Sequence, residues 1–494
     1  MNRPIPLAKH ATPFASLHLI IMISVILCSS GCVVSLTPAY RITKESNKIE
    51  FLSGHTPGIK LTASYTLENY GTTVLPFIDV ALRNAARYGT KDLVIKVDGH
   101  AITALPASDG PPQGQAPKFR IPFDPGWNPK QRRDVVIEYT FSAPEGLETD
   151  VGTAATSFYL ISPGWLPALQ APNYALSSVP ADADRSTYSV QIPADFLVLS
   201  SGKPRGRKKN QGMVEYRFEL RKGDLEPYIV AGRYVATSSR LKGGAVFWTF
   251  EPLKEDPAVA EQQMASVANI LQKNFGPLGK SDLAVHAVES SKQSTASSGE
   301  PMVTPFPAGV LINSQAIALG INSPNFSKLV TSGLAHSWFP DMNPLPDSLI
   351  GIGEGLPEYA DIAVGEALEG QAMRRRFVLK YLKEYREAYK EAVEKPLIST
   401  TLQDPVEQRR IALAKAPLFF IALEDVCGEE PVHRALTQIR RLLRGQEITY
   451  PDIRAALENV TNKDLAAMFR TWVYNVGIPA EFTERYENAA AGKN

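Results

Sequence analysis

The chain has 494 residues, of which 44% are hydrophobic and 21% are charged. This balance supplies enough apolar side chains for folded cores and excludes an intrinsically disordered protein. Its 52 basic and 51 acidic side chains give a formal net charge of +1. Such a charge creates no strong field for DNA, RNA or an anionic membrane surface, so we expect no nucleic-acid partner. The length predicts more than one domain.

Residues 1–31 have the pattern of an export signal. Basic residues precede an apolar run from Leu17 to Leu27, and the small residues Cys28–Gly31 follow directly before Cys32. This arrangement resembles the cleavage box of bacterial lipoproteins, in which the cysteine is acylated and becomes the new N-terminus. The resemblance makes Cys32 the lipid anchor, although Ser29 stands where that box usually carries leucine. Simple secretion and an uncleaved anchor helix remain alternatives, because the apolar stretch approaches the length of a membrane span.

Each of these alternatives places the rest of the chain outside the cytoplasm. We expect a membrane-anchored lipoprotein of the cell envelope, with a linker at residues 32–48. If Cys32 is acylated, Cys427 carries the one free thiol of the cleaved chain, so no disulfide can form within the mature chain. Cys427 follows an apolar run and is predicted to pack as a small hydrophobic side chain rather than to act as a nucleophile.

Residues 49–250 are predicted to form a β-rich domain. Short alternating or apolar runs separated by turn residues are typical of strands, and examples are Lys91–Asp98, Arg133–Tyr139 and Thr187–Ile192. A basic cluster from Lys203 to Lys209 lies between two such runs. We expect a solvated hairpin loop there rather than an anion site, since neighbouring like charges repel and favour water.

The apolar pattern then changes to helical spacing. Asp256 is a good N-cap, Pro257 suits the first helical position, and Gly276 ends the run. Residues 251–484 are therefore predicted to form a helix-rich domain, followed by a tail at 485–494. Further helices are predicted at Phe326–Phe339, Leu356–Leu368, Met373–Val393, Ala412–Val426, Val432–Leu443, Pro451–Val460 and Lys463–Val473. The whole chain is thus predicted to be an α+β multidomain protein.

Several segments, in order along the chain, resemble the membrane alanyl aminopeptidase family of gluzincin metallopeptidases. They are Glu226–Tyr234, Ile270–Leu278, Leu334–Phe339, Gly353–Tyr359 and Thr471–Pro479. The resemblance spans most of residues 50–483. It implies a saddle-like N-terminal β-domain followed by a mainly helical thermolysin-like domain.

The zinc motif of that family is altered in this chain. In H-E-x-x-H, two histidines on one helical face bind zinc, and the glutamate deprotonates the attacking water. The family pattern places Ser332 at the first histidine, Gly333 at the glutamate, His336 at the second histidine and Glu354 at the distant glutamate ligand. His336 and Glu354 are thus the remnant metal ligands, separated by one residue fewer than in the family. Gly333 is expected to leave a small gap where the glutamate carboxylate would lie.

Two further functional positions of the family also change. The loop whose glutamate holds the substrate amine corresponds to Val303–Gly309, where Pro305 or Phe306 takes the place of the glutamate. The tyrosine that stabilises the oxyanion falls near Leu413, and leucine cannot donate a hydrogen bond. We therefore assign no catalytic residue. The candidates for lining a groove are Ser332, Phe306 and Glu358.

These exchanges predict an envelope-anchored aminopeptidase-family homologue that is inactive as a zinc peptidase and binds a peptide or protein partner. No cofactor is expected, because a catalytic zinc site normally has three protein ligands and only two remain here. Zinc binding by these two remnant ligands stays an alternative. The alternatives are an active zinc metallopeptidase with an unusual ligand set, a Ser332 nucleophile with His336 as its base, and a purely structural envelope module. His336 also has an ordinary interpretation, as a histidine hydrogen-bonded inside the domain.

Overall fold

The computed structural model of the chain describes residues 40–54, 56–82, 89–106, 118–142, 151–161, 165–170, 185–221, 227–238, 245–278, 285–290, 302–307, 309–339, 342–344, 348–401, 404–442 and 447–488. The predicted export signal, the predicted anchor Cys32 and the end of the predicted tail lie outside these residues. Within the described part of the chain, no helix combines the length and the apolar composition needed to cross a membrane.

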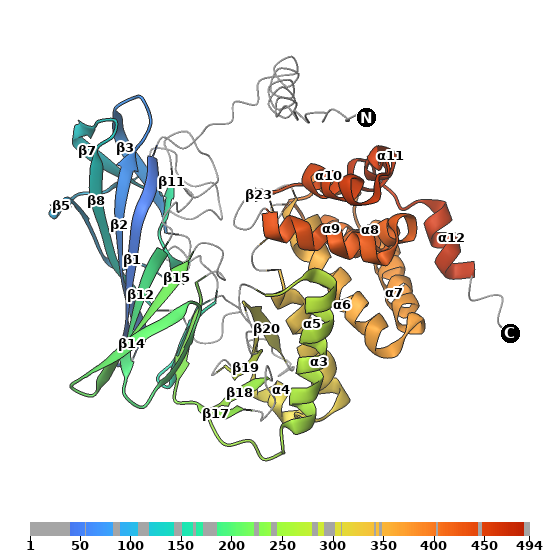
Figure 1. The fold of residues 1–494 in the computed structure, drawn as a ribbon, viewed down its shortest axis with the longest axis horizontal. Coiled ribbons are helices and arrows are strands. Elements are labelled where there is room, and N and C mark those ends of the chain that lie inside the picture. Colours follow the sequence, from blue (N-terminus) through green and yellow to red (C-terminus); the bar gives the residue numbers. More distant parts are fainter. Residues whose placement is uncertain are drawn as a thin grey trace, which may run out of the picture.

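A large sheet dominates the N-terminal half (Figure 1). In the described residues it has eight strands, in the spatial order β14-β15-β12-β1-β2-β8-β4-β5. Alternate side chains of β2 are buried, as expected for a sheet with one face in the core. The strands are β1 Tyr40–Leu52, β2 Gly58–Asn69, β4 Lys91–Val97, β5 His100–Ile102, β8 Arg132–Phe141, β12 Arg185–Pro193, β14 Lys203–Asn210 and β15 Met213–Arg221.

The sequence-based strand predictions match β4, β8 and β12, whereas two other expectations differ from the structure. Strand β1 already begins at Tyr40, within the stretch expected to be a linker. The loop predicted at Lys203–Lys209 is wrong, because these residues lie in β14, which pairs with β15 at the sheet edge. An edge strand tolerates a run of charges, since its side chains reach water and the charges prevent pairing with another chain.

Two smaller sheets share a hydrophobic core with the large one. In the described residues their spatial orders are β13-β16-β10-β9 and β11-β3-β7-β6. Phe51 of β1 stacks on Phe158 of β10, with ring centroids 5.4 Å apart, and so ties one of these sheets to the large sheet. The strands are β3 Leu75–Ala81, β6 Leu105–Pro106, β7 Lys118–Trp127, β9 Val151–Thr153, β10 Ser157–Leu160, β11 Ala168–Gln170, β13 Leu197–Ser200 and β16 Ile229–Gly232.

A further sheet supports the helical half. Its order in the described residues is β17-β18-β19-β21-β20, and β18, β19 and β21 run parallel. Strands β17 and β18 precede residue 250, yet they belong to this sheet, because β18 pairs with β19 of the helical half and β17 pairs with β18. The strands are β17 Val235–Ser238, β18 Val246–Thr249, β19 His286–Glu289, β20 Val303–Phe306 and β21 Gly309–Ile312, and a short pair is formed by β22 Asn343–Pro344 and β23 Glu447–Ile448.

The C-terminal half is mainly helical, as predicted. The α-helices are α3 Ala258–Phe275, α4 Ser314–Ala318, α5 Pro324–Ser337, α6 Gly355–Glu369, α7 Gln371–Tyr389, α8 Val406–Cys427, α9 Glu429–Leu442, α10 Tyr450–Thr461, α11 Ala466–Phe469 and α12 Ala480–Asn488. Shorter turns are the π-helical η3 Leu349–Glu354 and η5 Arg470–Tyr474 and the 3-10 helix η4 Leu397–Ser399. The helix predicted at Lys463–Val473 begins later, at Ala466, and its second part is π-helical, because α11 continues directly into η5.

Local signals fix the ends of α3. Asp256 accepts a hydrogen bond from the Ala258 amide at 3.0 Å, Pro257 is the N-cap, and Gly276 ends the helix at a φ of 79°. Such a positive φ favours glycine, because other side chains rarely adopt it. At the end of α8, Cys427 packs against the core, and burial raises the pKa of its thiol. The end at Gly276 and the packing of Cys427 agree with the sequence-based expectations, whereas the N-cap is Pro257 and not Asp256, one residue later than expected.

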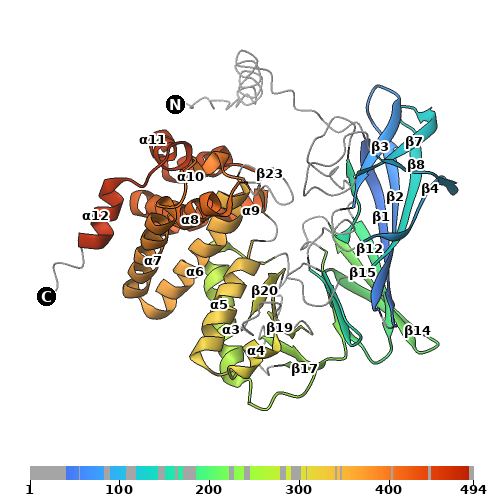
Figure 2. The same ribbon diagram turned by 180° about the vertical axis from the view of Figure 1, so that it is seen from behind.

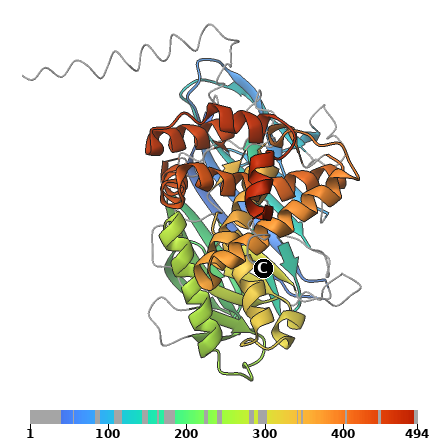
Figure 3. The same ribbon diagram turned by 90° about the vertical axis from the view of Figure 1, so that its right-hand side faces the viewer.

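The strand-rich and helical halves lie side by side (Figures 1 and 2), and Figure 3 views the helices with the large sheet behind them. Their boundary is not solvent, because Tyr159 and Tyr228 belong to the same hydrophobic core as helices α3 and α5. The fold is thus a β-rich N-terminal part followed by a helical C-terminal part, as predicted, with a continuous core across the junction.

Candidate functional site

Helix α5 carries the residues that stand at the zinc-motif positions. The helix begins after Ser323, whose hydroxyl accepts a hydrogen bond from the Phe326 amide at 3.2 Å. Its buried face packs on strands β20 and β21 and on helix α6. Ser332 and His336 are four residues apart and therefore project from one side of the helix, where both are partly exposed.

Helix α6 supplies the acidic side chains of the site. The π-helical turn η3 leads into it, and Gly355 at its start permits close packing on α8. A Cβ atom at Gly355 would lie 2.4 Å from the Cβ atom of Ala416, so only glycine fits without a shift. This packing holds Glu358 and Asp361, one helical turn apart, where they interact with His336 of α5.

His336 is held by Glu358. Its Nε2 atom lies 3.3 Å from Oε1 of Glu358, and the hydroxyl of Tyr381 on α7 donates a hydrogen bond to the other carboxylate oxygen. Burial alone would lower the pKa of His336, but the hydrogen bond and charge of Glu358 raise it above its usual value. Burial would raise the pKa of Glu358, whereas hydrogen bonds from His336 and Tyr381 hold it below its usual value. The pair therefore favours an imidazolium beside a carboxylate.

Ser332 lies close to Asp361, and its hydroxyl acts to lower the pKa of the Asp361 carboxyl group. Burial and the negative charge of Glu358 raise the pKa of Asp361 to about 6, against the opposing effects of His336 and Ser332. A serine nucleophile needs its hydroxyl bonded to a base such as imidazole. Among the described residues, the Nε2 atom of His336 lies 3.3 Å from Glu358, and no hydrogen bond joins the imidazole to Ser332, which does not support a serine–histidine mechanism.

The remnant ligands do not fit a catalytic zinc ion. Such an ion needs several protein donors at about 2 Å, including neutral imidazole nitrogens. Ser332 offers a neutral hydroxyl, and the Nε2 atom of His336 faces Glu358. Glu354 is exposed at the end of η3 and adds to the negative field around His336. Within the described residues, no group of three or more His, Cys, Asp or Glu side chains is placed to hold a metal ion.

Gly333 does not leave a gap, contrary to the expectation from the sequence. A Cβ atom at this position would lie 2.4 Å from Cγ1 of Val303 and 2.8 Å from Cγ1 of Val310. These valines belong to β20 and β21, on which α5 packs. The space in which a general-base glutamate would begin is therefore filled by two side chains of the sheet.

The segment expected to form the amine-binding loop is the strand pair β20 and β21. Pro305 is exposed, whereas Phe306 is 2% exposed and packs edge-on against Tyr228 with ring centroids 5.3 Å apart. Phe306, a groove candidate, is thus a core side chain in this structure. Leu413 is 36% exposed on α8, and its side chain offers no hydrogen-bond donor.

Comparison with known proteins shows similarity in structure alone. No protein-family model and no curated protein matches the sequence. An M1 zinc metallopeptidase from Deinococcus radiodurans aligns with 90% of this chain and 95% of its own, at a TM-score of 0.63 and 14% identity. A glutamate-to-alanine mutant of an M1 zinc metallopeptidase from that organism aligns with 89% of this chain and 96% of its own, at a TM-score of 0.64 and 14% identity. Yeast LTA4 hydrolase aligns with 90% of this chain and 69% of its own, at a TM-score of 0.60 and 12% identity.

The chain has the M1 zinc metallopeptidase fold. The resemblance found in the sequence is thereby confirmed at the level of fold. Identities of 12% and 14% establish the architecture and not the activity. The altered zinc motif and the lipoprotein-type signal stay predictions.

Two residues of this M1-fold site were missed in the sequence. Asp361 follows Glu354 and Glu358 at helical spacing, so a search for acidic residues on one helical face could have found it. Tyr381 lies on a different helix, and its contact with Glu358 follows from the packing of α7 on α6. No local pattern in the sequence signals that contact.

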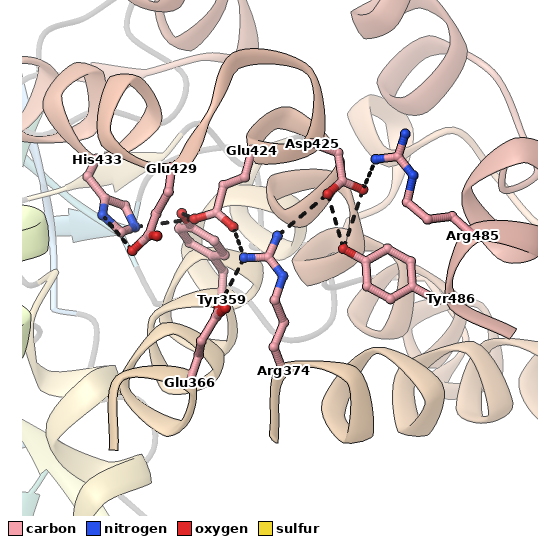
Figure 4. A network of polar contacts seen from close by, with 9 residues as sticks. All are labelled: Tyr359, Glu366, Arg374, Glu424, Asp425, Glu429, His433, Arg485 and Tyr486. Atoms are coloured by element: carbon pink, nitrogen blue, oxygen red, sulfur yellow. Dashed lines mark hydrogen bonds and ion pairs between the residues drawn. The ribbon is translucent and has the colours of Figure 1, made fainter. Parts of the chain in front are cut away.

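A second polar network of the M1 fold links helices α6, α7, α8, α9 and α12 (Figure 4). Its members are Tyr359, Glu366, Arg374, Glu424, Asp425, Glu429, His433, Arg485 and Tyr486. The Arg374 guanidinium lies 3.0 Å from Glu366 and also contacts Glu424, whose side chain is 4% exposed. Burial would raise the pKa of Glu424, but a hydrogen bond with His433 and the charge of Arg374 hold it below its usual value. Because opposite charges from different helices are paired in it, we interpret this network as holding the helices together.

Proposed function

We propose that this chain is an envelope-anchored protein that has the M1 fold, lacks zinc peptidase activity and binds a peptide or protein partner. The resemblance found in the sequence assigns the catalytic motif of the family to segments that form α5 and the start of α6. In this chain the same two helices carry Ser332, Gly333, His336 and Glu354 at the motif positions. In this proposal the protein has the fold of the M1 zinc metallopeptidases but not their metal-dependent catalysis.

The packing around Gly333 is the observation that carries the proposal. A general base at this position must direct a carboxylate toward a water molecule beside the metal. Here Val303 and Val310 lie within 2.8 Å of the place of any Cβ atom at Gly333. Side chains of the sheet therefore occupy the place of the general base. Restoring a glutamate at Gly333 would require a shift of the helix or of these valines in addition to the exchange of one side chain.

The environment of His336 supports the same proposal. A metal ligand must present a neutral imidazole nitrogen, because a protonated nitrogen has no lone pair. Glu358 raises the pKa of His336 and favours its protonated form. His336 then serves to hold α5 against α6 through its contact with Glu358.

Peptide binding is proposed from the fold and from the character of the site. A mutant of the Deinococcus protein, in which a glutamate is changed to alanine, is bound to a Tyr-Ser-Ala substrate. An M1 fold with one glutamate removed can thus still hold a tripeptide. In this chain Ser332 and Glu358 are partly exposed and present polar atoms between α5 and α6, so we infer a short peptide as the ligand class.

The test uses the Tyr-Ser-Ala tripeptide with the purified full chain. Calorimetry is expected to show saturable binding, while mass spectrometry shows no release of tyrosine with or without a chelator. Glu358→Gln should weaken binding about tenfold by removing a charged hydrogen-bond acceptor. Glu369→Gln, an exposed exchange at the far end of the same helix, should leave binding unchanged.

Two results would contradict this account. Chelator-sensitive release of tyrosine would favour the second candidate, an active zinc metallopeptidase with an unusual ligand set. Failure to bind the tripeptide and longer peptides would favour a purely structural envelope module. Both results leave the fold assignment intact.

Envelope anchoring is a separate part of the proposal. It rests on the signal-like residues 1–31 and on Cys32, which follows a small-residue stretch. Cys32→Ser should release the cleaved protein from the membrane fraction, since the acyl chains would be lost. A Cys32→Ser protein that is still cleaved and still sediments with membranes would rule out lipidation as the tether.

A further inference from the structure

Strand β14 presents a row of exposed basic side chains at the edge of the large sheet. All eight of its residues are exposed, and five are basic, namely Lys203, Arg205, Arg207, Lys208 and Lys209. At about 3.3 Å per residue, this charge extends over about 26 Å. Figures 1 and 2 show β14 on the side of the sheet away from the helical half. A long row of charge, with a bulge between Pro204 and Gly206, is therefore open to solvent.

The surrounding hairpin is far more basic than the chain as a whole. Residues 203–221, which comprise β14, the turn and β15, contain seven basic and two acidic residues, a net charge of +5. The whole chain has a net charge of +1, so the rest of it is net acidic. The positive charge is thus concentrated on one edge.

The acidic residues of the hairpin are already engaged. Glu219 pairs with Arg205 at 2.6 Å and also with Arg221, and Glu215 pairs with Arg217 at 3.0 Å. Four basic side chains of β14 form no ion pair with any described residue: Lys203, Arg207, Lys208 and Lys209. Charged side chains on an edge strand hinder its pairing with another chain. The surplus of like charges, which repel one another, calls for a further explanation.

We propose that β14 docks on an anionic phospholipid surface. A planar lipid surface offers a continuous sheet of negative charge that matches an extended basic strand, and each lysine or arginine near it adds to the attraction. The strand contains no aromatic residue, so it lacks the stacking platform on which single-stranded nucleic acids bind.

The position of β14 in the fold suits this role. Strand β1 begins at Tyr40, and eight residues of chain after Cys32 span at most about 28 Å. In the sheet order β14 is three strands away from β1, and Lys208 lies level with Glu50, ten residues along β1 from Tyr40. The basic residues of β14 therefore lie at the end of the sheet opposite to the start of β1. With the anchor proposed above, the protein would have two separate points of attachment, which would fix its orientation on the membrane.

The test measures binding of the full chain to vesicles, with Cys32→Ser in every sample so that acylation plays no part. Sedimentation compares phosphatidylglycerol-containing vesicles with phosphatidylcholine vesicles. The triple variant Arg207→Gln, Lys208→Gln and Lys209→Gln should bind the anionic vesicles on the order of 100-fold more weakly than the parent. The matched control, with the same charge change at exposed positions of the helical half, is Lys254→Gln, Lys273→Gln and Lys328→Gln, and it should bind like the parent.

Salt and a competing polyanion complete the test. The preference for anionic vesicles should vanish at about 1 M salt, where the Debye length falls to about 3 Å. Equal binding by the β14 variant and the control variant would overturn the proposal and leave edge protection as the role of these charges. Binding to single-stranded DNA that depends on β14, without binding to vesicles, would overturn it as well.

Discussion

Gly333 sets the distance between helix α5 and the strands on which it packs. Val303 and Val310 occupy the space into which any Cβ atom at this position would project. Protein interiors are close-packed, so a larger side chain here requires a shift of the helix or of the valines. This one glycine therefore links the geometry of the helix to the predicted loss of the general base.

Gly333→Ala should destabilise the protein, although alanine is normally favoured over glycine in a helix. Overpacking costs about 1–3 kcal/mol, which outweighs the roughly 1 kcal/mol of helix propensity. In a Val303→Ala background, the same exchange should be less costly by about 1 kcal/mol or more, because the nearest methyl group is removed. Urea unfolding of the four proteins in this cycle measures the coupling. Equal costs in the two backgrounds would refute the packing explanation.

Single residues of the site differ in how far the sequence predicts them. The exchanges at Ser332 and Gly333 are visible in the sequence, because the surrounding helix pattern fixes their register. The contact between His336 and Glu358 joins two helices, and the valines around Gly333 come from strands upstream. These contacts depend on tertiary packing, which is why the sequence suggested a gap where the structure has two methyl groups.

At the scale of elements, polar residues fix the relative positions of the helices. Arg374 of α7 joins α6 and α8 through Glu366 and Glu424, as Figure 4 shows. In a low-dielectric interior, such a charge is costly when its partner is removed. Elements with clear end signals, such as α3 between Pro257 and Gly276, were predictable from local sequence. Strand β14 was not predictable, because its run of like charges favours a solvated loop and only the pairing with β15 makes it a strand.

Arg374→Met should lower the free energy of unfolding by about 3–5 kcal/mol, since it leaves the buried Glu424 carboxylate without its cation. Arg376→Met is the matched control on the same helix, because Arg376 is exposed. Its effect should stay within about 0.5 kcal/mol. Chemical denaturation of both variants measures the difference. Similar small effects in the two proteins would show that the network contributes little to stability.

The same network predicts a dependence of stability on acid pH. The pKa of Glu424 in the folded protein lies below its ordinary value of 4.5. Its contribution to stability is therefore complete above that value and is lost as the pH falls through the folded pKa. Glu424→Gln should make the stability less sensitive to pH in this acid range, which urea unfolding at a series of pH values would measure. An unchanged acid dependence would assign the effect to other carboxyl groups.

At the scale of the whole molecule, the two halves share a core. Phe306 of the helical half packs against Tyr228 of the strand-rich half, and both belong to one hydrophobic cluster. The order of a β-rich part before a helical part was predictable, because the spacing of apolar residues changes between them. The pairing of β18 with β19 was not, since it joins strands on the two sides of that change.

The shared core predicts one cooperative unfolding transition. Phe306→Ala should lower the stability by about 3–5 kcal/mol, because Phe306 is 2% exposed. Calorimetry should show the whole transition moving to lower temperature. Leu368→Ala, at a residue that is 51% exposed, should cause little change. Two separate transitions, of which one is insensitive to Phe306→Ala, would indicate halves that fold independently.

Zinc binding by the purified chain is the measurement that tests the central claim most directly. Metal analysis after dialysis against zinc should find no stoichiometric zinc in the native chain, and His336→Ala should not change that result. The account predicts this because Ser332 is a poor donor and Glu358 raises the pKa of His336, which favours the protonated imidazole. One zinc ion per chain, lost in His336→Ala and accompanied by chelator-sensitive peptide cleavage, would contradict it.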